Sequence, residues 1–196
     1  KDSVTIHRGC FGGCSFCAIS AHQGKFVSSR SRRSVIKELT SISKDTSFKG
    51  RITDLGGPSA NMYQMQGIYL EQCAKCKRPS CIYPVICKNL NTDNSSLIEL
   101  YREARSIIGI NKITVGSGIR YDLIIDSKND PISINSLEYL KELVVHHVSG
   151  RLKVAPEHTS EKVLKLLRKP SFDIFIYLLK RFDDICQKNY LNQQLV

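Results

Sequence analysis

Apolar residues along this chain follow two periods that alternate from segment to segment. Short β-branched or alternating runs, each ended by a turn, predict strands near residues 4–7, 51–55, 112–115 and 152–155, and a further strand begins within 190–196. Apolar positions three or four residues apart predict helices over 34–44, 96–107, 135–148, 160–168 and 171–188. Strand and helix therefore alternate four times, which predicts a parallel sheet with right-handed crossovers and helices outside it.

The first three regular helices each carry a clear apolar face. Ser34 is a plausible N-cap of the first of them. The residues expected to point inward are Val35, Ile36, Leu39 and Ile42 in the first helix, Leu97, Leu100, Tyr101 and Ala104 in the second, and Leu137, Leu140, Leu143 and Val144 in the third.

Polar or glycine-rich segments follow the predicted strands. Ligand sites on parallel sheets lie at the carboxyl ends of the strands. The cysteine loop at 10–17, the Gly56-Gly57 turn, the Ser117 turn and the segment 156–158 would therefore share one rim. Their convergence favours an enzyme.

Three thiols stand within eight residues in Cys10-Phe11-Gly12-Gly13-Cys14-Ser15-Phe16-Cys17. A short loop can turn all three sulfurs toward one metal centre, and Gly12 and Gly13 allow the tight backbone that this requires. Three thiolates would leave one iron of a four-iron cluster without a protein ligand, and such an open position can bind a reactant. A structural zinc site would need a fourth ligand from elsewhere.

A second group of cysteines has the spacing Cys73-x2-Cys76-x4-Cys81-x5-Cys87 and lies within an insertion at 62–94. Four thiols match the ligand count of a structural zinc ion or a second iron–sulfur cluster, and the spacing does not separate the two. Unligated thiols are the alternative. Nearby basic residues would favour thiolates, namely Lys75, Lys77, Arg78 and Lys88. Cys186 stands alone on a helix, where packing is its expected role.

Length and composition indicate one globular domain over residues 1–196 that includes this insertion. No apolar run approaches the roughly 20 residues that cross a bilayer, so no membrane partner is expected. Clustered cysteines with unequal spacing favour metal binding in a reducing compartment, which predicts the cytoplasm. Because the chain starts at Lys1 and ends in a strand-like segment, we expect it to be a fragment of a longer protein.

The formal charge of +11 would attract nucleic acid or other anionic partners. Only residues 30–33 are locally dense in cations, and they are typical of a helix entry. Charge alone therefore supports a nucleic-acid partner only weakly.

The spacing Cys-x3-Cys-x2-Cys, with Phe16 before the last cysteine, resembles the motif of the radical S-adenosylmethionine (SAM) superfamily. The resemblance implies a [4Fe-4S] cluster on Cys10, Cys14 and Cys17 whose fourth iron chelates the amino and carboxylate groups of SAM. It also implies reductive cleavage of SAM to methionine and a 5′-deoxyadenosyl radical. A zinc knuckle or a chance cluster of thiols is the alternative.

The same resemblance implies further cofactor contacts. Gly56 and Gly57 stand where a Gly-Gly-Glu motif contacts the amino group of SAM, although Pro58 replaces the glutamate, so only backbone contacts carry over. The turn with Ser117 and Arg120 would meet the ribose or the carboxylate of SAM. Glu157 would accept the ribose hydroxyls, and Lys169, with Arg168 beside it, would pair with the carboxylate.

Five stretches resemble one subgroup, the YgiQ-type radical SAM proteins: 7–17, 54–61, 81–90, 117–122 and 153–170. This resemblance implies a partial (β/α) barrel of the radical SAM type, an open parallel sheet truncated after its fourth or at its fifth strand. It implies an enzyme of unknown substrate and an electron donor such as flavodoxin or ferredoxin. The alternative from another class is a zinc-stabilised RNA-binding module without catalysis, which would bind RNA in a salt-dependent way and lack a visible chromophore.

Overall fold

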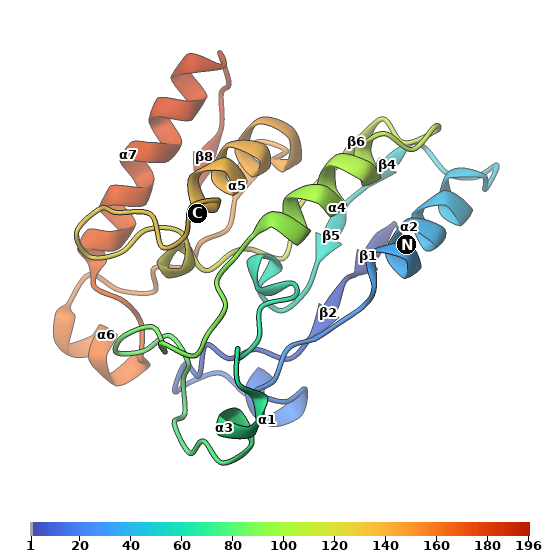
Figure 1. The fold of residues 1–196 in the computed structure, drawn as a ribbon. Coiled ribbons are helices and arrows are strands. Elements are labelled where there is room, and N and C mark those ends of the chain that lie inside the picture. The colour runs from blue at the N-terminus through green and yellow to red at the C-terminus, as the bar shows by residue number, and fades with distance from the viewer. Residues whose placement is uncertain (1) are drawn as a thin grey trace.

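The computed structural model describes residues 2–196 and has an α/β architecture (Figure 1). The strands are β1 (Ser3–Thr5), β2 (His7–Arg8), β3 (Ser28–Ser29), β4 (Arg51–Ile52), β5 (Asp54–Gly56), β6 (Lys112–Ile113), β7 (Arg151–Leu152) and β8 (Gln194–Leu195). The helices are α1 (Ile19–His22), α2 (Arg32–Ser43), α3 (Leu70–Ala74), α4 (Ser95–Arg105), α5 (Ser136–Glu142), α6 (Glu161–Leu167) and α7 (Phe172–Lys188). Two 3-10 turns at Ala60–Met62 and Tyr121–Leu123 and a π-helical turn at Leu143–His147 complete the elements.

Most strands pair in parallel, as the alternation of elements predicts. The pairs β1–β5, β4–β6 and β7–β8 are parallel, and β2–β3 is antiparallel. Backbone hydrogen bonds continue between the pairs, since Leu55 N–H donates to the carbonyl of Thr114 at 2.9 Å and Ile119 N–H to that of Lys153 at 3.1 Å. Within residues 2–196 the strands form four two-stranded sheets and do not close into a barrel. The partial (β/α) barrel therefore stays a prediction.

The long helices bury their apolar faces against these strands. The inward face predicted for the second helix is confirmed, because all four of its residues are at most 1% exposed in α4. The core residues that α2, α5 and α7 contribute are Val35, Leu39, Tyr139, Leu140, Ile174, Leu178, Phe182 and Cys186. Burial of Cys186 agrees with its expected packing role.

Two helix predictions need correction. Helix α2 begins at Arg32, because the hydroxyl of Ser31 accepts the Ser34 N–H at 3.2 Å, so Ser31 is the N-cap. The helix predicted over 135–148 changes to a π-helical turn after Glu142, and Leu137 is only partly buried. The apolar period indicates which side of a helix faces inward, but caps and the local change to a wider π-helical turn depend on side-chain hydrogen bonds and packing.

The π-helical turn carries a buried polar cluster. His147, which is 0% exposed, has Nδ1 3.2 Å from the carbonyl of Ile113 and Nε2 3.2 Å from Oε1 of Glu142. Glu142 also accepts from Nε of Arg105 at 2.8 Å. Burial alone would raise the pKa of Glu142, but the hydrogen bonds from His147 and Arg105 and the charge of Arg105 lower it to about 2. The residues of this cluster make their hydrogen bonds to one another and to the backbone of β6, which indicates a structural role.

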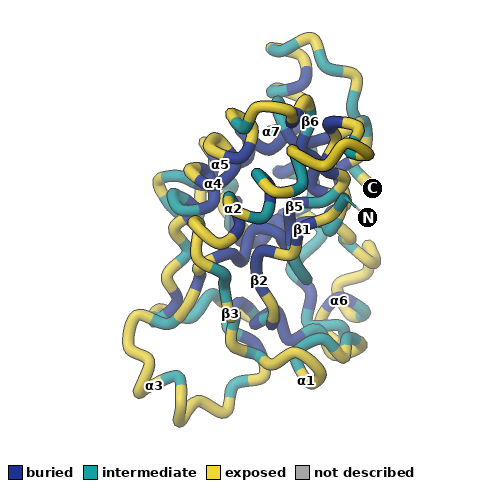
Figure 2. The backbone as a smooth tube through the Cα atoms, turned by 90° about the vertical axis from the view of Figure 1, so that its right-hand side faces the viewer, coloured by how far each residue is buried: buried dark blue, intermediate teal, exposed yellow. Residues whose placement is uncertain are grey.

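The cysteine-rich insertion has little regular structure. Its only α-helix within the described residues is α3, which buries no residue. Figures 1 and 2 both place α3 and α1 at the same end of the molecule, and Figure 2 shows the α3 segment almost wholly exposed. A small separate core joins this end to the domain and consists of Phe11, Met62, Met65, Ile82, Leu90 and Leu123.

Across residues 2–196, the helices are all too short or too polar to span a membrane.

Candidate functional site

The three cysteines of the first loop open onto one cavity of about 250 Å³. The cavity also receives polar side chains from segments far along the chain. Those that the sequence predicted are Ser117, Arg120, Glu157 and Lys169, together with Phe16 from the loop itself. The fold therefore brings most of the predicted site residues together.

The cysteine loop is held by backbone hydrogen bonds on several sides. Cys10 N–H donates to the carbonyl of Gly24 at 3.0 Å, and Cys17 N–H donates to that of Cys14 at 3.2 Å, which closes a turn. Ser15 binds the end of α6, where its hydroxyl donates to the carbonyl of Leu166 at 2.6 Å. These bonds fix the loop backbone without using the cysteine side chains.

Gly13 is required by a close approach of the insertion. It has φ +63°, and a Cβ there would lie 2.2 Å from the carbonyl oxygen of Pro79. The next cysteine of the insertion also contacts the loop, since Cys81 N–H donates to the carbonyl of Phe11 at 3.0 Å. The two cysteine-bearing segments are thus packed against each other.

Arg120 points its guanidinium at the thiol of Cys14. The distance from Nη1 to Sγ is 3.0 Å, and the other guanidinium nitrogens donate to Asp122 at 2.8 and 2.5 Å. Burial alone would lower the pKa of Arg120, but Asp122, through its charge and hydrogen bond, and the charges of the cysteines keep it above its usual value. Asn61 fixes the backbone of Arg120 with two hydrogen bonds of 2.8 Å. The guanidinium is thus a fixed cation beside a thiol.

Glu157 and Lys169 face each other across the cavity. Lys169 Nζ lies 3.7 Å from Oε1 of Glu157, and the lysine side chain is 4% exposed whereas that of the glutamate is 34% exposed. Burial lowers the pKa of Lys169, and the charge of Arg120 lowers it further, against Cys14, Asp122 and Glu157. The pair leaves a carboxylate and an ammonium group available to a ligand.

The backbone around this pair is strained. Ala155, Glu157 and Arg168 have φ of 46°, 71° and 54°, a region that costs energy for residues with a Cβ. The side chain of Arg168 donates to the carbonyl of Gly13 at 3.2 Å. Strain of this kind clusters at ligand sites, where the surrounding structure holds it in place.

Gly56 and Gly57 do not line the cavity. A Cβ on Gly56 would lie 2.0 Å from Oγ of Ser117, and one on Gly57 would lie 2.5 Å from Cε1 of His7. Asp54 holds the Ser117 turn, because its Oδ1 accepts the Ser117 N–H and hydroxyl, each at 3.1 Å. These glycines are therefore needed for packing under the site.

Three buried or partly buried residues near the cavity, His7, Asp54 and Asn61, had no role predicted from the sequence, and Asp122 was predicted only as part of the polar turn with Ser117 and Arg120. For His7 and Asp54 the available signal is their place within predicted strands that lead to the site, whereas Asn61 follows its strand by five residues. His7 is 1% exposed, and neither ring nitrogen makes a hydrogen bond within the described residues. Burial lowers its pKa to about 4, against a smaller opposing contribution from the backbone of Ser59.

The donor set of the first loop suits a thiophilic metal centre. Among residues 2–196, no three His, Cys, Asp or Glu side chains are already arranged as a metal site. The thiols of Cys14 and Cys17 nevertheless lie close enough to Cys10 for their charges to act on it, and burial raises the pKa of Cys10. Cysteine sulfurs move with a single χ1 rotation, and the Arg120 cation would offset thiolate charge.

The four cysteines of the insertion also gather. Cys76 N–H donates to the carbonyl of Cys73 at 3.0 Å and Cys87 N–H to that of Cys81 at 2.7 Å. Burial raises the pKa of Cys81, and the charges of the other three cysteines act on it in the same direction against Lys25.

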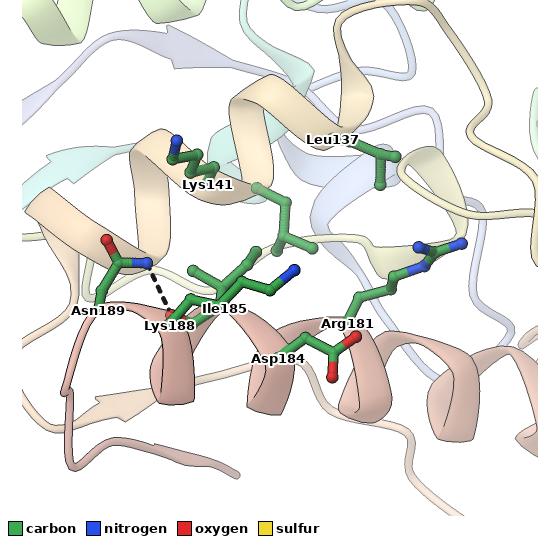
Figure 3. Close-up of a pocket in the computed structure, with 8 residues that line it drawn as sticks. Leu137, Lys141, Arg181, Asp184, Ile185, Lys188 and Asn189 are labelled. Carbon is green, nitrogen blue, oxygen red and sulfur yellow. Dashed lines mark hydrogen bonds between the residues drawn. The ribbon is translucent and has the colours of Figure 1, made fainter.

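A groove between α5 and α7 shares no lining residue with the cysteine cavity (Figure 3). Its volume is about 430 Å³, and Lys141, Arg181, Asp184 and Lys188 are among its lining residues. It contains no thiol, histidine or pair of carboxylates, so acid–base or metal chemistry has no basis there.

Several curated proteins that are similar to this chain carry the same family name. No protein-family profile matches the chain. A UPF0313 protein of Bacteroides thetaiotaomicron is 55% identical over 197 residues, which are 100% of this chain and 32% of the relative. UPF0313 proteins of Porphyromonas gingivalis and Vibrio vulnificus are 52% and 46% identical, again over 100% of this chain and over 31% and 24% of their own length. The chain spans about a third or less of these curated relatives, whose name states no activity. Along its whole length, then, the chain is similar to part of the UPF0313 proteins.

Proposed function

We propose that this chain binds a [4Fe-4S] cluster and SAM as part of a radical SAM enzyme of the YgiQ type. The observation that carries this proposal is the shared cavity of Cys10, Cys14 and Cys17 with Glu157 and Lys169. The resemblance implies these five residues as cofactor ligands, although more than a hundred positions separate the two groups in the sequence. Convergence of that kind is what a cofactor site requires.

The three cysteines would hold the cluster, and one iron would stay free for the amino and carboxylate groups of SAM. When bound and reduced, the cluster supplies the electron that cleaves SAM to methionine and a 5′-deoxyadenosyl radical. Each of the three guanidinium nitrogens of Arg120 donates to Asp122 or Cys14. We therefore assign its charge to the thiolate side of the site and not to the ribose or carboxylate of SAM.

Glu157 and Lys169 would hold the rest of the cofactor. On binding, Glu157 would turn from Lys169 to accept the ribose hydroxyls, and Lys169 would donate to the methionine carboxylate. Both contacts are charge-assisted hydrogen bonds, and the burial of Lys169 strengthens its contact by lowering the local dielectric. The strained backbone at Glu157 keeps its carboxylate at the cavity.

The substrate would enter from a neighbouring cavity of about 680 Å³ that shares Lys169 with the cysteine cavity. Its walls carry Asp122, Asp126 and Glu161 together with Lys88 and Lys165. Mixed charges of this kind favour a polar substrate. The net charge of +11 would attract an acidic electron donor such as flavodoxin or ferredoxin in the cytoplasm.

Anaerobic reconstitution with iron and sulfide tests the proposal. We expect a broad visible absorption band and an electron paramagnetic resonance signal of the reduced protein that changes on addition of SAM. Cys14→Ala should abolish SAM cleavage, and Cys186→Ala, which removes a buried thiol from α7, should leave it intact.

Retention of SAM cleavage by Cys14→Ala would overturn the proposal. A colourless protein that holds only zinc, ignores SAM and binds RNA more weakly as salt rises would instead favour the RNA-binding module.

A further inference from the structure

The cysteine-rich insertion lacks the means to hold its shape by burial alone. Helix α3 spans five residues and buries none of them. The small core beneath the insertion contains six buried residues, of which Ile82 and Leu90 come from beyond α3. Segments with so little core are ordinarily held by a disulfide or a metal. All eight cysteines of the chain are free in this structure.

Three of the four thiols of the insertion share a second cavity. It has a volume of about 190 Å³ and is lined by Cys73, Cys81 and Cys87. The side chains of Phe11 and Met65 also line it, so the thiols lie beside apolar surface. An apolar surround shields a metal–thiolate centre from water and exchange.

Polar groups around these sulfurs are suited to thiolates. Asn89 directs its side-chain amide at Sγ of Cys73, with a distance of 3.3 Å from Nδ2. Lys25 Nζ lies 4.0 Å from Sγ of Cys76 and its charge acts on Cys81. An amide donor tunes a metal centre with four thiolates, and a nearby cation offsets part of its negative charge.

Gly67 also makes room for this group of thiols. A Cβ at Gly67 would lie 2.2 Å from Sγ of Cys73, so a larger residue would displace the sulfur. The backbone of Gly67 pairs with Leu90, which closes the insertion into a loop around the cavity. Gly67 and Leu90, where this loop begins and ends, thus enclose the thiols on one side of the cavity.

We propose that Cys73, Cys76, Cys81 and Cys87 bind a second metal centre through four thiolates, separate from the site of the first loop. The metal centre would be a zinc ion or an iron–sulfur cluster, both of which bind thiolates. Because Cys81 N–H binds the carbonyl of Phe11, metal binding would also fix the loop that carries Cys10 and Cys14.

A variant that lacks the first set of thiols tests this site directly. The protein with Cys10→Ala, Cys14→Ala and Cys17→Ala is purified anaerobically from cells supplied with both metals, and its zinc, iron and sulfide are measured. We expect about one zinc per chain without colour, or iron and sulfide with a visible band. Either result supports the second site and identifies its metal.

Further variants on the same background link the metal to these thiols. Cys76→Ser, at an exposed position that leaves the core intact, should lower the metal content at least about tenfold, and Cys186→Ser should not change it. Removal of the metal by a chelator should accelerate tryptic cleavage after the exposed Lys75 and Lys77 about tenfold or more.

A triple variant that holds neither metal in stoichiometric amount would overturn the proposal. So would a metal content that Cys76→Ser and Cys81→Ser both leave unchanged. Because the first set of thiols is absent from this background, both outcomes are independent of whether the chain cleaves SAM.

Discussion

The buried ion pair beside the cysteine loop allows a sharp test of the site geometry. Asp122 receives two hydrogen bonds from the guanidinium of Arg120, and the two side chains are only 9% and 8% exposed. Asp122→Asn removes the charge but keeps the shape. It leaves the buried guanidinium without a carboxylate partner, beside the thiol of Cys14. Breaking a buried pair in this way typically costs about 3–5 kcal/mol.

We expect Asp122→Asn to lower the free energy of unfolding by about 3 kcal/mol, at the lower end of that range, because the asparagine oxygen can still accept one hydrogen bond. This corresponds to a fall in melting temperature of about 6–12 °C for a chain of this size. The assay is urea and thermal unfolding of the metal-free protein by circular dichroism and tyrosine fluorescence, since the chain has no tryptophan.

Glu138→Gln is the matched control. It makes the same change of acid to amide at a surface pair with Arg102, whose side chains are 49% and 51% exposed. Exposed pairs contribute about 0–1 kcal/mol, so this variant should unfold almost like the wild type. A second variant that combines Asp122→Asn with Arg120→Met removes both charges and should recover most of the lost stability. Equal stability of Asp122→Asn and Glu138→Gln would refute the inference that the buried pair of Arg120 and Asp122 stabilises the fold.

Three further expectations concern stability. Gly13→Ala should destabilise the protein by more than about 2 kcal/mol, because its Cβ would meet the insertion backbone. Gly24→Ala is the control: Gly24 has φ +94° and no atom within 4 Å of a Cβ, so this variant should cost only about 1 kcal/mol of backbone strain. Equal losses of stability in urea unfolding would contradict this. His7 has a folded pKa of about 4 against 6.5 unfolded, so stability present above pH 6.5 should be lost as the pH falls toward 4, by about 3 kcal/mol in total. His7→Phe should flatten this limb of the pH–stability curve, and an unchanged slope would exclude His7 as its cause. Leu39→Ala, at a fully buried position, should cost about 2–5 kcal/mol, and Leu166→Ala, at 75% exposure, about 0.5 kcal/mol or less in the same unfolding assay.

Local patterns in the chain were sufficient for most of the regular elements. The four residues predicted to face inward from α4 are all buried, since a period of 3.6 residues records which side of a helix avoids water. The parallel pairs agree with the alternation of strand and helix. The short segments α1, α3 and β3 were missed, because two to five residues carry too little periodicity to read.

For the candidate site, too, some features could be predicted from the sequence and others could not. The clustered thiols and the polar residues after the strands could be named from the sequence, because their chemistry and their place at strand ends are local properties. Their partners could not. The contacts of Arg120 with Asp122 and Cys14, and the space that the Gly56-Gly57 turn leaves for Ser117 and His7, depend on the tertiary structure.

Tertiary structure alone decided these partners, because they depend on contacts between residues up to about 150 positions apart. Arg168 reaches the carbonyl of Gly13 only after α6 has packed beside the cysteine loop. Gly13 has its role only because the backbone of Pro79 approaches it. Which side chain fills which space is set by the packing of whole elements, and a pattern of residue types along one segment carries no information about its neighbour in space.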